Sequence, residues 1–476
     1  MVETGLANAV VTGIVTGSII ALGAIGLALV YSIAEVPNFA HGELLTIGAY
    51  LALLVNQPTT VPLFDTFAAG PQELSAVGLA ILFVLAGGAF LAAVYLLGGR
   101  SALEGSWWPT TPPPTVGLVV HAVAAAAIGG LVVVGFPSIL AGLLLSALLL
   151  AVLAPLLERY VFRKFRSRGA SLATMLIVAL GLSFVLRFST QAYFSGEPRS
   201  FTVPDVGTVF GQQVVLSAAR WFDFYLHGGG IVVQILDTAD ASHPELALLS
   251  YSWPVIAVIV VVTLAVAALV YRVRSGGEYG GGSTFGPRLS ATVAGAAAFV
   301  VLVLVLPGGG SVPSDPIATT RVSLSLVRAG VVALAMVMMT SLHLLLQETK
   351  LGTAMRAASD NKDLARITGI NTDRVMMSTW ILAGAFAAVG GVMLGILFAT
   401  VRINMGFFLL LPMFAGVILG GLGSVYGAIL GSFLVGVAMD VGIYSFHIGA
   451  VYRVPVAFVV LFVVLLVRPQ GITGGS

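Results

Sequence analysis

The sequence predicts an all-α fold, a polytopic transmembrane helix bundle with about 11–13 spans. Of its 476 residues, 58% are hydrophobic and only 9% are charged, and the mean hydropathy is +1.05. These values lie far outside the range of soluble globular proteins. Because about 20 apolar residues cross a bilayer as a helix, the length accommodates about a dozen helices and one substantial loop. We therefore expect residues 1–476 to form a single multi-pass domain in the cell (plasma) membrane.

Apolar stretches mark the expected helices in order. They lie near residues 5–33, 40–57, 76–98, 116–135, 137–158, 171–194, 251–272, 289–307, 322–347, 373–400, 408–421, 425–446 and 449–468. The first follows an acidic residue and no basic one, so we expect it to be kept as a helix and not removed as a signal peptide. The sequence Gly420-Gly421-Leu422-Gly423-Ser424 predicts a break between two helices of a hairpin.

Polar or helix-breaking segments separate some of these stretches. Residues 101–115 are Pro-rich and residues 275–287 are Gly-rich, which indicates junctions around added helices. We delimit one added helical insertion at residues 71–136. Residues 195–250 contain six acidic residues and two arginines, and we expect an extracellular loop there. This loop either meets an extracellular partner or is a plain solvated excursion.

Basic residues predict the orientation, because positively charged loops are retained in the cytoplasm. With residues 348–374 inside, 15 of the 22 Lys and Arg residues lie on the cytoplasmic side. The N-terminus is then outside and the C-terminus is cytoplasmic. This assignment requires residues 408–446 to cross the membrane an even number of times, which the predicted hairpin satisfies.

Residues 348–374 form the longest charge-dense run, with nine charged residues between two apolar stretches. Such a segment must contact water at a membrane face, and we interpret residues 348–372 as a cytoplasmic coupling loop for a soluble partner. A plain solvated loop is the alternative interpretation.

Local signals within this loop predict short coupling helices. Asp360 and Asp363 resemble a capping arrangement for a helix over residues 361–368, and Gly369 suits its left-handed closing residue. An earlier helical turn is expected at residues 353–359. An apolar strip typical of a helix in a partner's groove would then be formed by Met355, Ala358, Leu364 and Ile367.

Few polar residues lie within the apolar stretches, where an ionised side chain costs about 2.5–3.5 kcal/mol. Asn38, His41 and Glu43 stand where the first loop enters the second helix. They either lie near a translocation path or form a cap, with Asn38 capping the helix and Glu43 in its first turn. His41 and Glu43 are two residues apart and share no helical face, which argues against a metal site.

Other polar and small residues admit two interpretations each. Arg187, His343 and Asp440 either line a polar route or are satisfied inside the bundle. The glycines near residues 416–431 either pack closely against another helix or expose backbone to a substrate at the break. Arg402 and Asn404 either meet a substrate-delivering protein or mark the membrane interface.

The sequence contains no signal for chemistry of its own. It has no cysteine, which excludes thiolate catalysis and Cys-ligated metals. Lys164, Lys350 and Lys362 are preceded by Arg, Thr and Asn, so no P-loop is present and any ATP must be bound by another polypeptide. A net charge of +2 does not suggest nucleic acid. We expect no enzyme activity and no metal or cofactor bound by this chain. Membrane lipid is expected to surround it.

Several motifs together resemble the LivH-type permeases of branched-chain amino acid ABC importers. They are VYSIAEVPNFAHGELLTIGAY (30–50), LERYVFRKFRSRGASLATMLIVALGLSF (157–184), LGTAMRAASDNKDLARITGINTDRV (351–375), GAFAAVGGVMLG (384–395), GGLGSVYGAILG (420–431) and RPQGI (468–472). The resemblance implies an ATP-driven importer with a LivM-like second permease subunit, two ATP-binding subunits and an extracellular substrate-binding protein.

The resemblance also implies roles for particular residues. The ATPase-coupling residues would be Met355, Arg356, Ala357, Ala358, Asp360, Leu364, Ile367, Gly369 and Ile370. The resemblance places Asn38, His41 and Glu43 near the translocation path. The predicted break adds Gly420, Gly421, Gly423 and Ser424 to the candidate path, because membranes tolerate broken backbone only beside a cavity. Arg356-Ala357-Ala358 stands where the general importer loop has Glu-Ala-Ala, so this loop departs from that pattern.

Three alternatives remain from the sequence. Permeases for urea or short amides share much of the pattern. An ion-coupled secondary transporter would use Arg187, His343 and Asp440 inside the membrane. A membrane enzyme lacks support, because neither a metalloprotease nor a serine-hydrolase motif occurs.

Overall fold

The computed structural model describes residues 5–70, 72–104, 113–203, 206–209, 212–215, 219–237, 245–275, 291, 294–295, 298–299, 301–303, 305–309, 311–467 and 471–472. Within them, ten helices are long and apolar enough to cross a membrane. This confirms the predicted polytopic helical fold. The chain divides into two compact units, and the single permease domain stays a prediction. The first comprises residues 1–11, 204–329 and 341–352, and the second comprises residues 12–203, 330–340 and 353–476.

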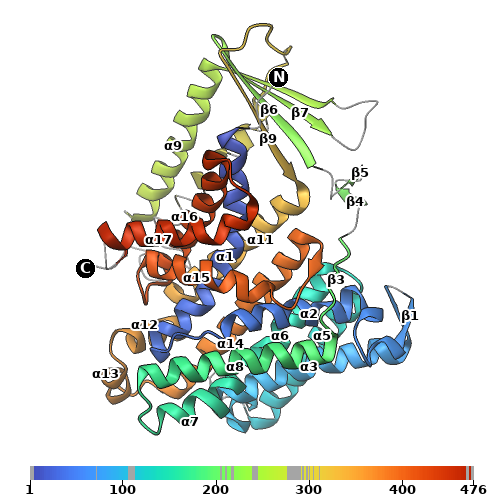
Figure 1. Cartoon of the computed structure of the whole chain (residues 1–476), viewed down its shortest axis with the longest axis vertical. Coiled ribbons are helices and arrows are strands. Elements are labelled where there is room, and N and C mark those ends of the chain that lie inside the picture. The colour runs from blue at the N-terminus through green and yellow to red at the C-terminus, as the bar shows by residue number, and fades with distance from the viewer. Residues whose placement is uncertain are drawn as a thin grey trace. The chain divides into compact units, whose positions relative to one another are not determined.

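The helices follow the predicted stretches closely (Figure 1). They are α1 Leu6–Ala34, α2 His41–Asn56, α3 Ala76–Gly98, α4 Arg100–Leu103, α5 Pro114–Val134, α6 Ile139–Leu157, α7 Arg163–Arg166, α8 Leu172–Phe194, α9 Trp253–Ser275, α11 Leu326–Glu348, α12 Lys350–Asp360, α13 Lys362–Ile367, α14 Thr372–Phe398, α15 Met405–Gly420, α16 Val425–Phe446 and α17 Arg453–Val467. Short 3₁₀ turns cover Pro58–Thr60, Asp65–Phe67 and Ala450–Tyr452, and a π-helical turn covers Glu158–Phe162. The predicted span at 289–307 lies partly outside the described residues.

Serine side chains begin several of these helices. Ser75, Ser138 and Ser171 each accept a hydrogen bond from the backbone amide three residues later. Such a cap satisfies one of the amides that the first turn of a helix leaves unpaired. Polar residues next to apolar runs therefore define where the helices begin.

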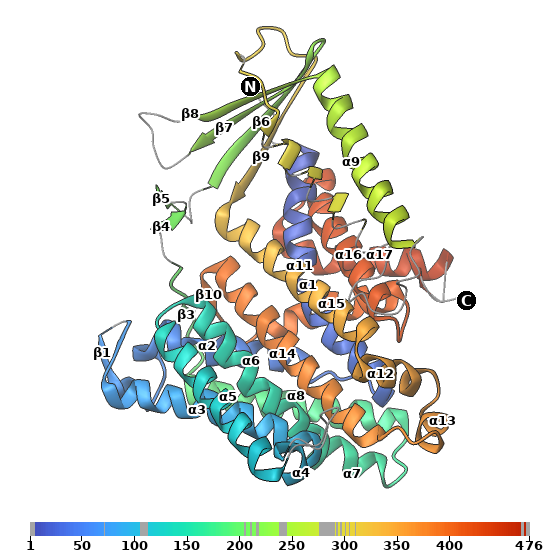
Figure 2. The ribbon, with the colours of Figure 1, turned by 180° about the vertical axis from the view of Figure 1, so that it is seen from behind.

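The second unit contains a helix bundle (Figure 2). In it, α2 packs against α6, α14 and α15, α3 packs against α5 and α6, and α15 packs against α16 and α17. The apolar window of α14 is 72% buried, whereas that of α8 is only 17% buried. The helix α14 therefore lies inside the bundle, whereas α8, which packs against α2, has an outer face that is free to contact lipid. The predicted insertion at 71–136 contains α3, α4 and α5.

Glycines allow the helix backbones of this bundle to approach closely. A Cβ at Gly420 would lie 1.9 Å from the Gly427 oxygen, and one at Gly431 would lie 2.1 Å from the Gly416 oxygen. Both distances are far below van der Waals contact, so α15 and α16 pack backbone against backbone. Each helix carries a Gly-x-x-x-Gly pattern, which forms one small-residue face. Close packing is thus the structural role of the glycine face.

The first unit contains an antiparallel sheet in the order β8-β7-β6-β9. Its strands are β6 Ala219–His227, β7 Gly230–Asp237, β8 Glu245–Ser252 and β9 Ala318–Ser325. The shorter strands are β1 Ala68–Gly70, β2 Glu73–Leu74, β3 Arg199–Ser200, β4 Val206–Val209, β5 Gln212–Val215 and β10 Thr400–Val401. Hence the segment 195–250, predicted as a loop, contains strands. The omitted signal was a hairpin, in which Gly228-Gly229 separates two runs rich in β-formers.

A cross-strand ion pair reinforces this sheet. Asp223 on β6 lies opposite Arg321 on β9. Two guanidinium nitrogens of Arg321 donate to the two carboxylate oxygens of Asp223, each at 2.6 Å, and the guanidinium lies 4.3 Å from the Trp221 ring centre. The hydrogen bonds to Asp223 raise the pKa of Arg321 above its ordinary value. Because β9 extends to Ser325, the predicted span 322–347 begins with a strand, and its helix begins only at Leu326.

Adding one methyl group at Gly420 should weaken the α15–α16 contact. We expect Gly420→Ala to lower the free energy of unfolding by about 1–3 kcal/mol through overpacking. Denaturation in mixed detergent micelles measures this change. The matched control is Gly181→Ala on α8, where an added Cβ meets nothing within 4 Å; it should be neutral or stabilising. Equal stability of the two variants would show that the contact is unimportant.

Candidate translocation path and coupling segment

The coupling segment forms two helices followed by the long helix α14. The predicted turn at 353–359 lies within α12, and the predicted helix at 361–368 matches α13. Asn361 caps α13, since its side-chain oxygen accepts from the Leu364 amide at 2.9 Å. Asp360 instead ends α12, so the capping prediction was wrong by one residue. Gly369 adopts the left-handed conformation, with φ of +91°, and Asn371 caps α14.

The four residues of the predicted apolar strip differ in exposure. Met355 and Ala358 are buried, with 2% and 3% of their surface exposed. Leu364 and Ile367 are 54% and 81% exposed. The strip is therefore not one surface: α12 turns its apolar side into the protein, and α13 presents its apolar side chains to the outside. Within the predicted coupling set, Arg356, Asp360 and Gly369 are also exposed, and Ala357 and Ile370 are half-buried.

Charged residues after α6 interact electrostatically with α13. Glu158, on the π-helical turn after α6, is fully buried and forms an ion pair with Arg166. Burial lowers the pKa of Lys362 on α13, and the positive charge of Arg166 lowers it further, while Glu158 acts in the opposite direction. The charges of α13 are therefore coupled to the end of α6. Nearby, Arg163 pairs with Asp373 at 3.0 Å.

Buried polar contacts hold the N-terminal end of α2. The Asn38 side-chain oxygen accepts from the Ala40 amide at 3.1 Å, and His41 Nε2 lies 2.9 Å from the Gly23 carbonyl oxygen. Ala40 occupies the N-cap position of α2 without a side-chain cap, so Asn38 does not cap the helix as the alternative interpretation required. Glu43 lies in the first turn of α2, as expected.

Glu43 forms a buried ion pair that the sequence analysis did not find. Arg187 on α8 donates to Glu43 through Nε at 3.0 Å and also through Nη2, and Ser183 donates at 3.3 Å. The Glu43 and Arg187 side chains are only 1% and 12% exposed. The Phe407 ring lies 4.2 Å from the guanidinium. Both charges were singled out from the sequence, but no local signal joins residues 144 positions apart.

The helical break at residues 420–424 is a tight turn whose backbone groups are largely paired. The Gly421 amide donates to the Val417 carbonyl at 3.0 Å, and the Ser424 amide donates to the Gly421 carbonyl at 3.2 Å. Ser424 caps α16 by accepting from the Gly427 amide at 3.0 Å. Gly423 has a φ of +91°, which an L side chain rarely adopts. The geometry therefore favours the packing interpretation of these residues.

Asp440 on α16 is also paired. One of its carboxylate oxygens lies 3.0 Å from an Arg453 guanidinium nitrogen, and the other accepts from the Thr16 hydroxyl at 3.0 Å. His343 lies half-buried on α11. Over the described parts of the chain, no group of three His, Cys, Asp or Glu residues is arranged to hold a metal ion.

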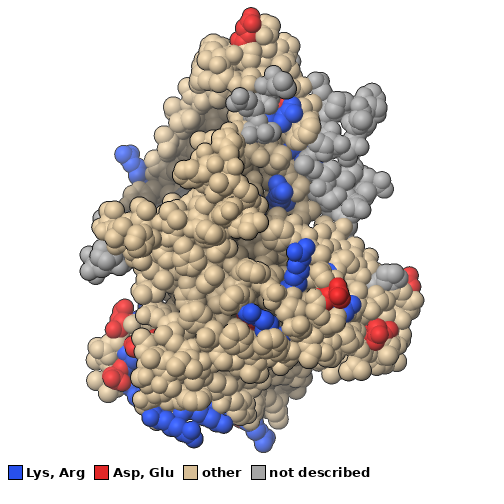
Figure 3. Space-filling view, viewed as in Figure 1, with Lys and Arg blue, Asp and Glu red and all other residues tan. Residues whose placement is uncertain are grey.

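Charged side chains are sparse on the face shown in Figure 3, as expected for a surface that contacts lipid. Together with the spanning helices and the ion pairs inside the bundle, this surface defines a multi-pass helical membrane protein. A family model described as "Branched-chain amino acid transport system / permease component" matches residues 9–101 and 246–467. The chain belongs to this family of transport permeases, as its motifs predicted.

Curated relatives have names of the same kind. The chain is 37% identical over 136 residues to the high-affinity branched-chain amino acid transport system permease protein LivH of Salmonella typhimurium, and 38% identical over 136 residues to BraD of Pseudomonas aeruginosa. It is 34% identical over 142 residues to a probable LivH of Methanocaldococcus jannaschii. These matches cover 29% of this chain and 44–45% of the relatives, less than half their length. No solved structure matches.

Breaking the buried pair should destabilise the bundle. We expect Glu43→Ala and Arg187→Ala each to cost about 3–5 kcal/mol, because each leaves one buried charge unpaired. The double variant should cost less than the sum of the two, as measured by denaturant titration in detergent. The exposed pair Arg163–Asp373 is the control, and its removal should cost at most about 1 kcal/mol. Additive losses would indicate that the two charges do not interact.

Proposed function

We propose that this chain is a membrane-spanning permease subunit of an ATP-driven importer for branched-chain amino acids. The observation that carries the proposal is the membership of the permease family, joined with a charged helix pair, α12 and α13, that interrupts the apolar chain. The names of the curated relatives support the substrate class. The absence of a P-loop motif in the sequence assigns ATP hydrolysis to another polypeptide.

The coupling segment supports a mechanical role. Leu364 and Ile367 project from α13 and offer an apolar contact to a soluble subunit. Lys362 on the same helix interacts with Glu158 and Arg166 beyond α6. In this proposal, a push on α13 is transmitted to the helix bundle through the chain, which continues directly into α14, and the electrostatic attraction between Lys362 and Glu158 links α13 to the end of α6. In this proposal, ATP-driven closure of two ATPase subunits switches the bundle between outward-open and inward-open states.

The remaining components of the complex follow from this role. A LivM-like second permease subunit would complete the pathway, and an extracellular binding protein would deliver the substrate. The coupling segment would face the cytoplasm, with the N-terminus outside and the C-terminus inside, as the distribution of Lys and Arg predicts. The residues at the entrance of α2 and at the Gly420–Ser424 turn would support the translocation path by holding its helices in place.

Two rival transport functions make different predictions. A urea or short-amide importer would use the same architecture with another cargo. An ion-coupled secondary transporter would need titratable groups that exchange partners inside the membrane; Glu43 and Asp440, however, are each held by an arginine and a hydroxyl group, which favours a structural role.

Reconstitution tests the substrate class. The chain, its second permease subunit and two ATPase subunits are assembled in proteoliposomes with substrate-binding proteins loaded with leucine or with urea. We expect the leucine-loaded protein to stimulate ATP hydrolysis several-fold and to deliver leucine. Stimulation by the urea-loaded protein alone would assign the chain to the rival importer. Uptake that survives ATP depletion but collapses with the ion gradient would assign it to the secondary transporters.

Substitution of the exposed α13 residues tests the docking surface. We expect the double variant Leu364→Asp and Ile367→Asp to lose the ATPase subunits on co-purification, because two charges would be buried at an apolar contact. The conservative variant Ile367→Val should retain them. Both substitutions lie on an exposed surface, so the gel-filtration profile of the permease should stay unchanged. An intact complex with the double variant would exclude α13 as the docking helix.

A further inference from the structure

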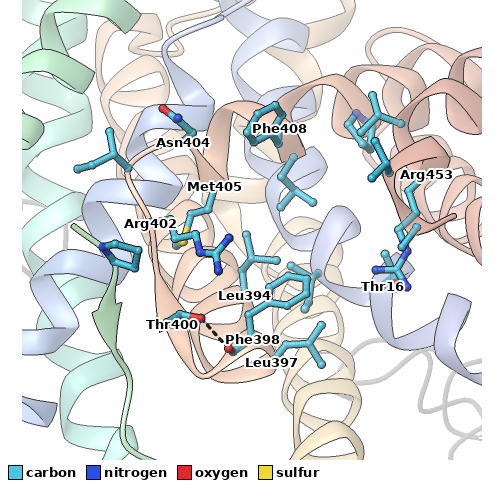
Figure 4. A pocket seen from close by; sticks show the side chains of 18 of the residues that line it. Thr16, Leu394, Leu397, Phe398, Thr400, Arg402, Asn404, Met405, Phe408 and Arg453 are labelled. Atoms are coloured by element: carbon cyan, nitrogen blue, oxygen red, sulfur yellow. Dashed lines mark hydrogen bonds between the residues drawn. The ribbon is translucent and has the colours of Figure 1, made fainter. Parts of the chain in front are cut away.

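A cavity of about 600 Å³ lies within the unit that contains the helix bundle (Figure 4). Residues of α1, the end of α14, the first turns of α15 and the chain around the start of α17 form its wall. Small-molecule sites in proteins typically measure roughly 300–1,000 Å³. The cavity is therefore large enough for an amino acid.

Arg402 is the free charge of this cavity. Its side chain is exposed in the wall, and among the described residues no hydrogen-bond or ion-pair partner is found for it. The other arginine of the wall, Arg453, is paired with Asp440, which also accepts the hydrogen bond from Thr16. Figure 4 shows Arg402 and Arg453 well apart, with Leu394 and Phe408 between them. The paired charges cancel, so the cavity retains one net positive charge at Arg402.

The rest of the wall is mainly apolar. Leu394, Leu397 and Phe398 contribute from α14, and Phe408 and Leu409 contribute from α15. Asn404, next to Arg402, adds an exposed amide that both donates and accepts hydrogen bonds. A guanidinium pairs with a carboxylate through two parallel hydrogen bonds, and an aliphatic side chain gains by leaving water for such an apolar wall.

We propose that this cavity is a binding station for an aliphatic α-amino acid within the permease itself, with Arg402 holding the α-carboxylate. Asn404 contacts the polar end of the amino acid, and the α14 and α15 side chains surround its aliphatic end. The proposal rests on the proposed function and specifies it, because it places part of the substrate recognition in this chain. Urea has no carboxylate and would leave Arg402 unpaired, so the station also separates the two importer functions.

Direct binding tests the station. The purified full-length chain is placed in lipid nanodiscs, and binding of radiolabelled leucine is measured. We expect Arg402→Gln to weaken leucine binding roughly 10-fold or more, since it removes a charge-assisted hydrogen bond. Arg402→Lys should keep part of the affinity. Leucinamide, which lacks the carboxylate, should compete at least 10-fold less well than leucine with the wild-type chain.

The matched control is Arg168→Gln, which changes an exposed arginine outside the cavity wall and should leave binding unchanged. Equal binding by the wild type and Arg402→Gln, or equal competition by leucinamide, would overturn the proposal. The proposal would also be overturned if neither the wild type nor Arg402→Gln bound leucine and a phospholipid co-purified with the wild type only. If the wild-type chain binds no leucine while the assembled importer still transports it, the station is refuted and the proposed function stands. A complex that fails to respond to leucine would instead refute the function.

Discussion

Close approach of helix backbones at glycine is the constraint on which the bundle depends. A Cβ at Gly406 of α15 would lie 1.9 Å from the Gly42 oxygen of α2, and one at Gly391 of α14 would lie 1.9 Å from the Leu45 oxygen. In a hydrocarbon environment, apolar side chains gain little by exchanging lipid for protein, so dense backbone contact must supply much of the association between helices. The helix α2 is held in this way from two sides.

This packing also positions the buried charges. His41 and Glu43 flank Gly42, so the contact between α2 and α15 orients both side chains. Phe407 follows Gly406 and places its ring against the Arg187 guanidinium that binds Glu43. The Glu43 carboxylate is stabilised inside the membrane because Arg187 and Ser183 both donate to its Oε1. Arg402 differs in this respect: its guanidinium faces a cavity, so its electrostatic potential is available to a ligand.

The segment formed by α12 and α13 combines buried and exposed apolar side chains. Its first helix buries Met355 and Ala358, which anchors the segment, and its second exposes Leu364 and Ile367. The exposed helix carries Lys362, whose charge interacts with the buried Glu158 at the end of α6. One side of the segment is thus fixed to the protein while the other is free to bind. That division suits an element that transmits a movement from a soluble partner to membrane helices.

The sequence alone determined the class of fold, most helix positions, the charged segment and the family, because hydropathy and helix-ending residues act locally along the chain. It also identified Glu43, Arg187 and Asp440 as unusual. Only the tertiary structure decided that Glu43 pairs with Arg187 and Asp440 with Arg453, since such contacts depend on which helices become neighbours. The pairing of β6 with β9 was missed for the same reason: Asp223 and Arg321 are 98 residues apart, and pairing between distant segments leaves little trace in either one. The hairpin of β6 and β7 did leave a local signal, its turn at Gly228-Gly229. The cavity around Arg402 exists only where separate helices meet.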